Sequence, residues 1–122
     1  VLFDAEQADL VKYRRKRAGH LQCKGRYLAS QILAMLEGDL WLANARHANS
    51  AAAEIASGCG DRLMHPVEAN ELFVRLSTEE RESLRAQDFA FYDWGEDAAR
   101  FVTAWDTRDE DAAALGKAIA GL

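Results

Sequence analysis

The apolar residues in the first half of the chain recur every three or four positions, which is the period of an amphipathic helix. A first helix is expected over residues 5–17, because Asp4 and Gln7 resemble a capping box at its start. Gly19 follows this helix and is a natural stop. The first predicted element is therefore a helix that begins directly after Asp4.

A longer apolar stripe runs over residues 24–57 and is interrupted at Gly38. It fits either one kinked helix or two helices in succession, and Asp39 is suited to cap the second of two. We favour two helices that share one core face and end at Gly58 and Gly60.

After these two glycines the apolar period changes from about 3.6 to about 2 residues, as a half-buried strand requires. The alternation is carried by the run Leu72, Phe73, Val74, Arg75 and Leu76. A second strand is expected over residues 88–93 and a third over residues 99–105. The second half of the chain is therefore predicted to contain a small sheet.

Two further helices are predicted from capping boxes, each with a Ser or Thr three residues before a Glu. The box at Ser77 opens a short polar helix that reaches about Gln87, and the box at Thr107 opens the last helix. The resulting order of elements predicts an α+β domain. Its sheet of about three strands should be small, mainly antiparallel and covered by helices on one face.

Composition supports a folded domain, because the 122 residues are 49 % apolar and 29 % charged. No apolar stretch is long enough for a membrane helix, so no membrane partner is expected. Cys23 and Cys59 are too few for a disulfide framework, which makes the reducing cytoplasm the simpler location. Neither the cysteines nor the three histidines show the spacing of a zinc site, so no metal is expected.

The chain begins without Met, on the apolar triplet Val1-Leu2-Phe3. This triplet reads as the end of a buried strand rather than as a natural start. We therefore expect the chain to be a piece of a larger protein.

Positive charge is concentrated near the start of the chain. Residues 1–26 hold seven basic and three acidic side chains, although the whole chain has a net charge of −5. The cations at 12–17, with Lys24 and Arg26 beyond a turn, suit a bound phosphate. The alternative is a solvated basic face that complements the dipole at the end of a helix. Nucleic acid is the weaker prediction, because the rest of the chain is acidic and lacks a recognised binding motif.

Arg100 is a charged residue within the apolar strand pattern of residues 98–105, so its side chain needs a partner. In one interpretation Arg100 pairs with a carboxylate of this chain at the edge of the strand. In the other it faces a cleft and holds a carboxylate ligand with both arms of its guanidinium.

Several segments together resemble the C-terminal part of low-specificity threonine aldolases, which belong to the aspartate-aminotransferase-like group of pyridoxal-phosphate enzymes. The resemblance rests on the order and spacing of these segments as well as on the motifs within them. The segments are Tyr13-Arg14-Arg15-Lys16-Arg17-Ala18-Gly19, Arg26-Tyr27-Leu28-Ala29-Ser30-Gln31, Trp41-Leu42-Ala43-Asn44-Ala45-Arg46-His47-Ala48-Asn49, Pro66-Val67-Glu68-Ala69-Asn70-Glu71-Leu72-Phe73-Val74 and Arg100-Phe101-Val102-Thr103-Ala104-Trp105-Asp106.

The resemblance implies that residues 1–122 form a single C-terminal small domain of a fold-type I enzyme. Residues 1–23 would be its linking helix and loop, residues 24–122 the small domain proper, and Val1-Leu2-Phe3 the last strand before it. The large domain of such enzymes carries the lysine that forms the Schiff base with pyridoxal phosphate. The isolated chain is therefore expected to be inactive and to hold no catalytic residue.

The implied reaction of the full-length protein is the cleavage of L-threonine or allo-threonine to glycine and an aldehyde. Such enzymes act on small-molecule amino acids, and a cytoplasmic dimer or tetramer of identical subunits is expected, without nucleic acid. An alternative within the same fold is another β-eliminating lyase. An alternative of another class is an autonomous interaction module that binds an acidic partner through the basic helix end.

The resemblance also assigns individual binding residues. Lys16 matches the family lysine that reaches across a subunit interface to the neighbour's cofactor phosphate. Lys24 is expected to approach the same phosphate, although Cys23 aligns equally well if the loop is shifted by one residue. Arg100 matches the arginine that binds the substrate carboxylate. The family thereby favours the ligand-binding interpretation of Arg100.

Overall fold

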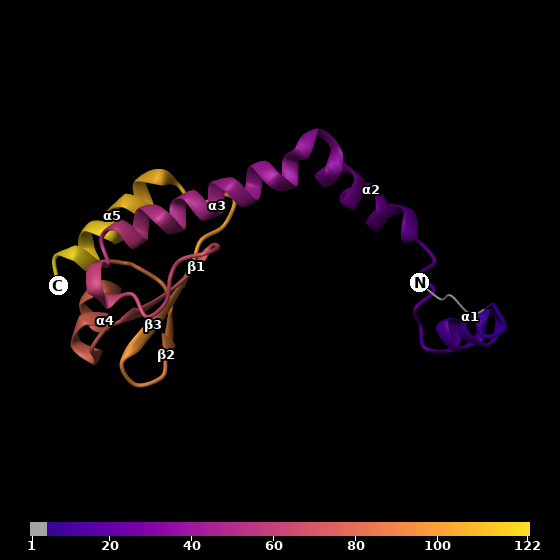
Figure 1. Cartoon of the computed structure of the whole chain (residues 1–122), viewed down its shortest axis with the longest axis horizontal. Coiled ribbons are helices and arrows are strands. Elements are labelled where there is room, and N and C mark those ends of the chain that lie inside the picture. Colours follow the sequence, from indigo (N-terminus) through magenta and orange to yellow (C-terminus); the bar gives the residue numbers. More distant parts are fainter. Residues whose placement is uncertain (1–4) are drawn as a thin grey trace. The chain divides into compact units, whose positions relative to one another are not determined.

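The computed structural model describes residues 5–122, which form two compact units that divide between Gly38 and Asp39 (Figure 1). The expected strand at Val1-Leu2-Phe3 and the cap at Asp4 lie outside the described residues. We therefore describe each unit by itself. The boundary that we expected after residue 23 stays a prediction.

The first unit contains the helices α1 (Ala8–Arg17) and α2 (Gly25–Leu36), neither of which has a buried residue. α1 begins three residues later than expected, and the side chain of Gln7 at its N-cap makes no capping hydrogen bond. Gly19 follows α1 with a φ of 74°, a left-handed conformation that favours glycine. The predicted stop is therefore confirmed.

The long apolar stripe forms two helices, as favoured from the sequence. A short 3₁₀ turn (Glu37–Asp39) separates α2 from α3 (Leu40–Ser57), and Gly38 within it has a φ of 60°. Asp39 precedes α3 but its side chain does not cap the helix. α2 buries no residue, and because α2 and α3 belong to separate units the shared core face stays a prediction. α3 buries Ala48, Ala51, Ala52 and Ile55.

The second unit holds a three-stranded antiparallel sheet in the order β1-β3-β2. Its strands are β1 (Glu71–Arg75), β2 (Tyr92–Trp94) and β3 (Ala98–Val102). The first strand and the sheet class are confirmed, and the third strand ends three residues earlier than expected. The second strand starts four residues later than expected, because Asp88 has a left-handed φ of 67° at the predicted start.

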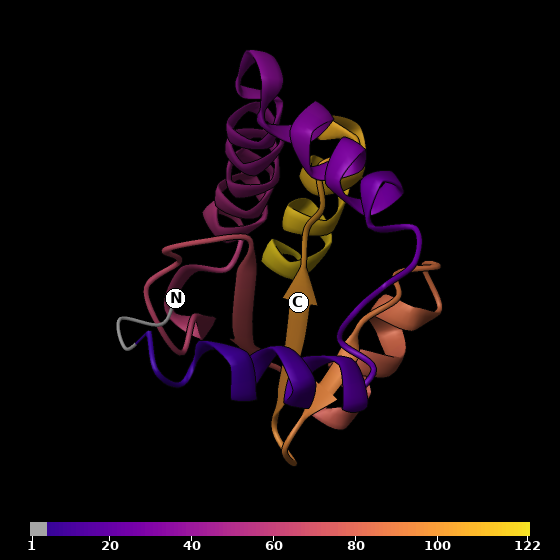
Figure 2. The same ribbon diagram turned by 90° about the vertical axis from the view of Figure 1, so that its right-hand side faces the viewer.

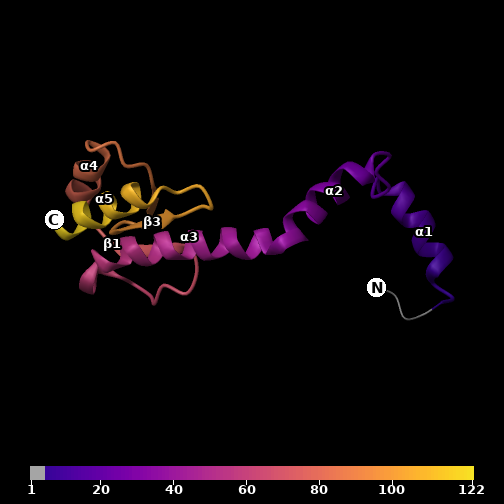
Figure 3. The same ribbon diagram turned by 90° about the horizontal axis from the view of Figure 1, so that it is seen from above.

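Helices cover one face of this sheet, as predicted. Leu72 and Val74 of β1 point to that face and pack with Phe101 of β3, with α3, and with α4 (Thr78–Arg85) and α5 (Asp109–Ala120). Figures 2 and 3 show α3 and α5 running side by side. The opposite face is open, with Tyr92, Trp94 and Val102 largely exposed. An open face is where a sheet can meet a ligand or another domain.

Two glycines allow α3 and α5 to approach closely. A Cβ atom on Gly58 would collide with the backbone of Gly116. A Cβ on Gly116 would lie 3.2 Å from the carbonyl oxygen of Glu54. The contact between the two helices therefore depends on the absence of side chains at both positions.

The two predicted capping boxes had different outcomes. At α4 the backbone N–H of Glu80 donates to Ser77 Oγ over 3.3 Å, and the N–H of Ser77 donates to Glu80 Oε2 over 2.8 Å, so this box is confirmed. The box at Thr107 was wrong, because α5 begins after Arg108. The Thr107 hydroxyl instead accepts a hydrogen bond from the backbone N–H of Ala104 over 2.8 Å.

Candidate functional site

The described part of the chain offers no metal centre and no membrane span. Residues 5–122 contain no group of three or more His, Cys, Asp and Glu residues arranged to hold a metal ion. No helix among the same residues is both long and apolar enough to cross a membrane. The candidate binding groups are therefore the cations named above.

Arg100 lies on the central strand of the sheet, opposite Phe73 of β1 and Tyr92 of β2. Its side chain is half-buried on the face that the helices leave open. Arg100 also lines a surface hollow of about 270 Å³ with four neighbours, which are Ala90, Phe91, Tyr92 and Val102. The structure thus gives Arg100 the access that a ligand-binding arginine needs.

Arg100 also has a partner within the chain, as its alternative interpretation required. Its Nε donates a charge-assisted hydrogen bond to Glu71 Oε1 of β1. Among residues 5–122, neither Nη nitrogen of Arg100 has a hydrogen-bond partner. A guanidinium carries N–H donors on Nε and on both Nη nitrogens. The protein therefore holds Arg100 at Nε, and the two Nη nitrogens stay open to a ligand.

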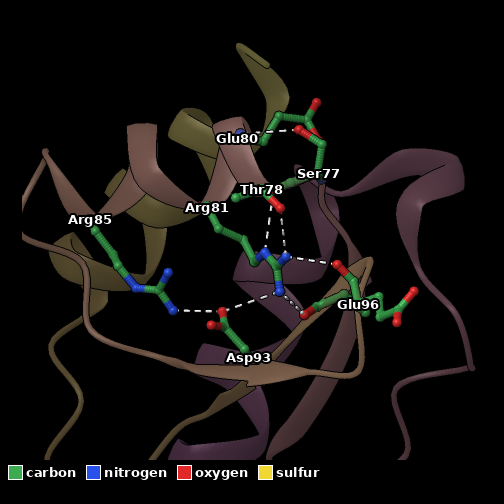
Figure 4. Close-up of polar contacts among 8 residues, drawn as sticks. Ser77, Thr78, Glu80, Arg81, Arg85, Asp93 and Glu96 are labelled. Atoms are coloured by element: carbon green, nitrogen blue, oxygen red, sulfur yellow. Dashed lines mark hydrogen bonds and ion pairs between the residues drawn. The ribbon is translucent and has the colours of Figure 1, made fainter.

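A second arginine, which the sequence did not single out, is the most deeply buried charged residue among those described. Arg81 of α4 is 6 % exposed. Its guanidinium donates to the carbonyl oxygens of Ser77 (3.3 Å), Ala98 (3.3 Å) and Glu96 (2.7 Å), and to Thr78 Oγ1 (3.2 Å) (Figure 4). Arg81 thereby joins α4 to the β2–β3 hairpin that carries Arg100.

Asp93 of β2 completes this network on its exposed side. Its Oδ1 lies 2.6 Å from Arg85 Nη2 and 3.3 Å from Arg81 Nη1 (Figure 4). The hydrogen bond from Arg85, and then the charges of both arginines, hold the pKa of Asp93 below its usual range. The sequence signal for this cluster was weak, namely that Arg81 shares a helix face with the apolar Leu84.

The predicted phosphate-binding cations belong to the first unit. Lys16 is exposed in the last turn of α1, within the basic run Arg14, Arg15, Lys16 and Arg17. Lys24 is exposed at the N-cap position of α2, and Cys23 beside it is also exposed. Neither lysine side chain has a hydrogen bond or ion pair with another described residue. Lys16 and Lys24 thus belong to the first unit, whereas Arg100 belongs to the second.

Comparison with known proteins identifies the resemblance directly, although no protein-family model matches the sequence. The chain is 40 % identical over 124 residues to the low specificity L-threonine aldolase of Pseudomonas aeruginosa, covering 98 % of this chain and 36 % of that protein. Nearly the whole chain is thus similar to part of a threonine aldolase. The low specificity L-threonine aldolase of a Pseudomonas species is 38 % identical over 114 residues, covering 89 % of this chain and 33 % of that protein.

A solved structure gives the same result for the fold. The threonine aldolase of Leishmania major superimposes with a TM-score of 0.77 at 26 % identity, covering 88 % of this chain and 34 % of that chain. The chain therefore spans about one third of the length of the threonine aldolases that it matches. Nearly all of it takes part in the match, so both units share the likeness.

Proposed function

We propose that this chain is the C-terminal small domain of a pyridoxal-phosphate-dependent aldolase. The full-length enzyme would cleave L-threonine or allo-threonine to glycine and an aldehyde. The observation that carries this proposal is the 40 % identity to a low specificity L-threonine aldolase over 98 % of the chain. The open arginine of the second unit adds to it, because an amino-acid substrate presents a carboxylate.

The residues of the first unit suit the phosphate end of the cofactor. A phosphate dianion needs cationic or N–H donors that are not already neutralised by the protein. Lys16 and Lys24 meet this requirement, since both are exposed and neither pairs with another described side chain. In this proposal Lys16 serves the cofactor of a neighbouring subunit, so the enzyme acts as a homo-oligomer. Pyridoxal phosphate, when bound, supplies the electron sink for breaking the Cα–Cβ bond.

The second unit would bind the carboxylate of the substrate. Arg100 would hold the carboxylate of the 3-hydroxy amino acid through two parallel N–H···O bonds. This two-point contact orients the substrate, so that the bond to be broken keeps one direction relative to the cofactor. The covalent lysine and the base for the β-hydroxyl are expected in the remaining two thirds of the enzyme. The chain by itself should therefore bind and orient but not catalyse.

Threonine cleavage by the protein that contains this chain tests the proposal. With pyridoxal phosphate present, we expect acetaldehyde and glycine to form in equal amounts from L-threonine or allo-threonine. The 122-residue chain should produce neither. Cofactor-dependent loss of a β-substituent without C–C cleavage would instead identify a β-eliminating lyase. Failure to act on any amino acid would overturn the proposal.

Replacement of Lys16 tests the phosphate site. Lys16→Ala should weaken cofactor binding about ten- to a hundredfold, because a charge-assisted contact is worth about 1.5–3 kcal/mol. Lys12→Ala is the matched control, since Lys12 lies on the same helix but pairs with Asp9 at 2.9 Å. Titration of the apoenzyme with pyridoxal phosphate measures both. Equal dissociation constants for wild type and Lys16→Ala would reduce the basic run to a solvated helix end.

A further inference from the structure

We propose that Glu71 is a positioning residue for substrate binding, which fixes the direction in which Arg100 presents its two Nη groups to a carboxylate. This inference rests on the proposed function, since it takes the substrate carboxylate as the ligand of Arg100. It adds a residue that does not touch the substrate itself.

The register of the sheet explains why Glu71 reaches Arg100. In the antiparallel pair β1–β3, Glu71 is opposite Val102 and Phe73 is opposite Arg100. Glu71 is therefore the diagonal neighbour of Arg100 on the same open face of the sheet. Such diagonal positions lie about 7–8 Å apart, within reach of two long side chains. The contact is built into the strand register rather than into a loop.

The backbone that carries Glu71 is held firmly. Asn70, the preceding residue, donates from Nδ2 to the carbonyl oxygen of Thr103 over 2.7 Å and accepts from the Thr103 N–H over 2.9 Å. The buried Thr103 hydroxyl in turn donates to the carbonyl oxygen of Ala48 on α3 over 2.7 Å. The start of β1 is thus tied to β3 and to α3. The backbone at Glu71, from which its carboxylate extends, is therefore held in place.

Glu71 binds the Nε atom of Arg100, and this choice of donor determines where a ligand can bind. A guanidinium has one N–H on Nε and two on each Nη, so a carboxylate can bind it along either an Nε–Nη edge or the Nη–Nη end. Glu71 takes Nε, and neither Nη has a partner among residues 5–122. With Nε occupied, the Nη–Nη end is the free place for a second carboxylate. Glu71 therefore selects one of the two binding directions.

Stability alone does not account for the pair. The side chains of Glu71 and Arg100 are each 36 % exposed, and ion pairs with this access to water contribute little to stability. A flexible arginine at the rim of a hollow would, however, sample several rotamers. Anchoring one nitrogen removes that freedom before the ligand arrives, which is preorganisation.

The test compares a substrate that has the carboxylate with one that lacks it, in the full-length enzyme. We would measure kcat/KM for threonine and for threonine amide, together with the melting temperature. Glu71→Ala should lower the preference for the carboxylate at least about fivefold, because the two-point contact loses its alignment. Glu71→Asp keeps the charge but retracts it by one methylene, so it should lower the preference as well. Glu71→Gln keeps an oxygen acceptor for Nε and should restore most of it.

Glu82→Ala is the matched control, because Glu82 is exposed on α4 and its side chain has no hydrogen bond or ion pair with another described residue. A loss of activity shared equally by threonine and its amide in both Glu71→Ala and Glu71→Asp would overturn the proposal, since it would show a structural pair only. An unchanged preference in Glu71→Asp would do the same if Glu71→Ala did not fold. Absence of threonine cleavage in the wild type would overturn the proposed function instead, so the two failures are distinguishable.

Discussion

Two arginines of the second unit, Arg81 on α4 and Arg100 on β3, illustrate how surroundings decide the use of a side chain. The donors of Arg81 point to carbonyl oxygens and a hydroxyl of its own chain, and the residue is almost completely buried. Arg100 is held by a single nitrogen on the open face. A buried charge requires a full set of partners, whereas an exposed edge with free donors is suited to a ligand. Arg81 therefore stabilises the hairpin, and Arg100 is the binding candidate.

The network around Arg81 predicts a pH dependence of stability through Asp93. Because the pKa of Asp93 is lowered in the folded state, the unfolded state binds protons more readily, and the stabilisation is present at neutral pH and lost as the pH falls through the carboxyl range. Asp93→Asn should therefore unfold at a lower urea concentration than the wild type at pH 7. The difference should shrink as the pH falls through the carboxyl range, because the wild-type side chain then becomes neutral as well.

Asp61→Asn is the control for this experiment, because Asp61 is exposed and its carboxylate has no hydrogen bond within residues 5–122. Its urea midpoint should follow that of the wild type at every pH. A difference between Asp93→Asn and wild type that stayed constant from pH 7 to about pH 2 would show that the charge of Asp93 is not what holds the hairpin.

At the scale of elements, the second unit depends on the packing of α3 against α5 across two glycines. Gly58→Ala should destabilise the chain by about 1–3 kcal/mol, because its Cβ would force the backbones at Gly58 and Gly116 apart. Gly121→Ala is the control, since a Cβ there meets the nearest atom at 3.5 Å, an ordinary contact. Urea unfolding measures both. Equal stability of the two variants would mean that α3 and α5 do not pack as described.

The elements also show what the sequence could predict. The alternation at Leu72 and Val74 and the capping box at Ser77 are local signals, and both were confirmed. The box at Thr107 failed because Ala104, across a turn, competes for the same hydroxyl. The apolar stripe of α2 indicates that one face of this helix needs a partner but not where the partner is, so the core face expected between α2 and α3 stays a prediction.

The candidate site was predictable only in part. Arg100 stood out because a charge interrupted an apolar pattern, and the structure places it on the open face of the sheet. Glu71 and Arg81 did not stand out, because their roles arise from strand register and from packing between α4 and the hairpin. Such contacts join positions far apart in sequence. Periodicity and local motifs carry no information about them.

At the scale of the whole chain, the two units differ in how their helices are supported. α1 and α2 have no buried residue, and helices this short are marginal in water without packing. In the 122-residue chain, backbone amides of α2 should therefore exchange with deuterium at least about tenfold faster than those of β3. Mass-spectrometric or NMR exchange measures this. Equal protection of both elements would show that α2 has a partner within the chain.

We propose above all that this chain supplies the arginine that holds the substrate carboxylate of a threonine aldolase. Arg100→Lys keeps the positive charge but loses the planar two-point contact. Steady-state kinetics of the full-length variant on threonine, with a cofactor titration alongside, measures the effect most directly. Arg75→Lys is the control, since Arg75 is exposed on neighbouring strand β1. We predict that kcat/KM falls at least about tenfold in Arg100→Lys, with cofactor affinity nearly unchanged. A wild-type kcat/KM, or a loss confined to thermal stability, would contradict the account and leave Arg100 as the ion-pair partner of Glu71 alone.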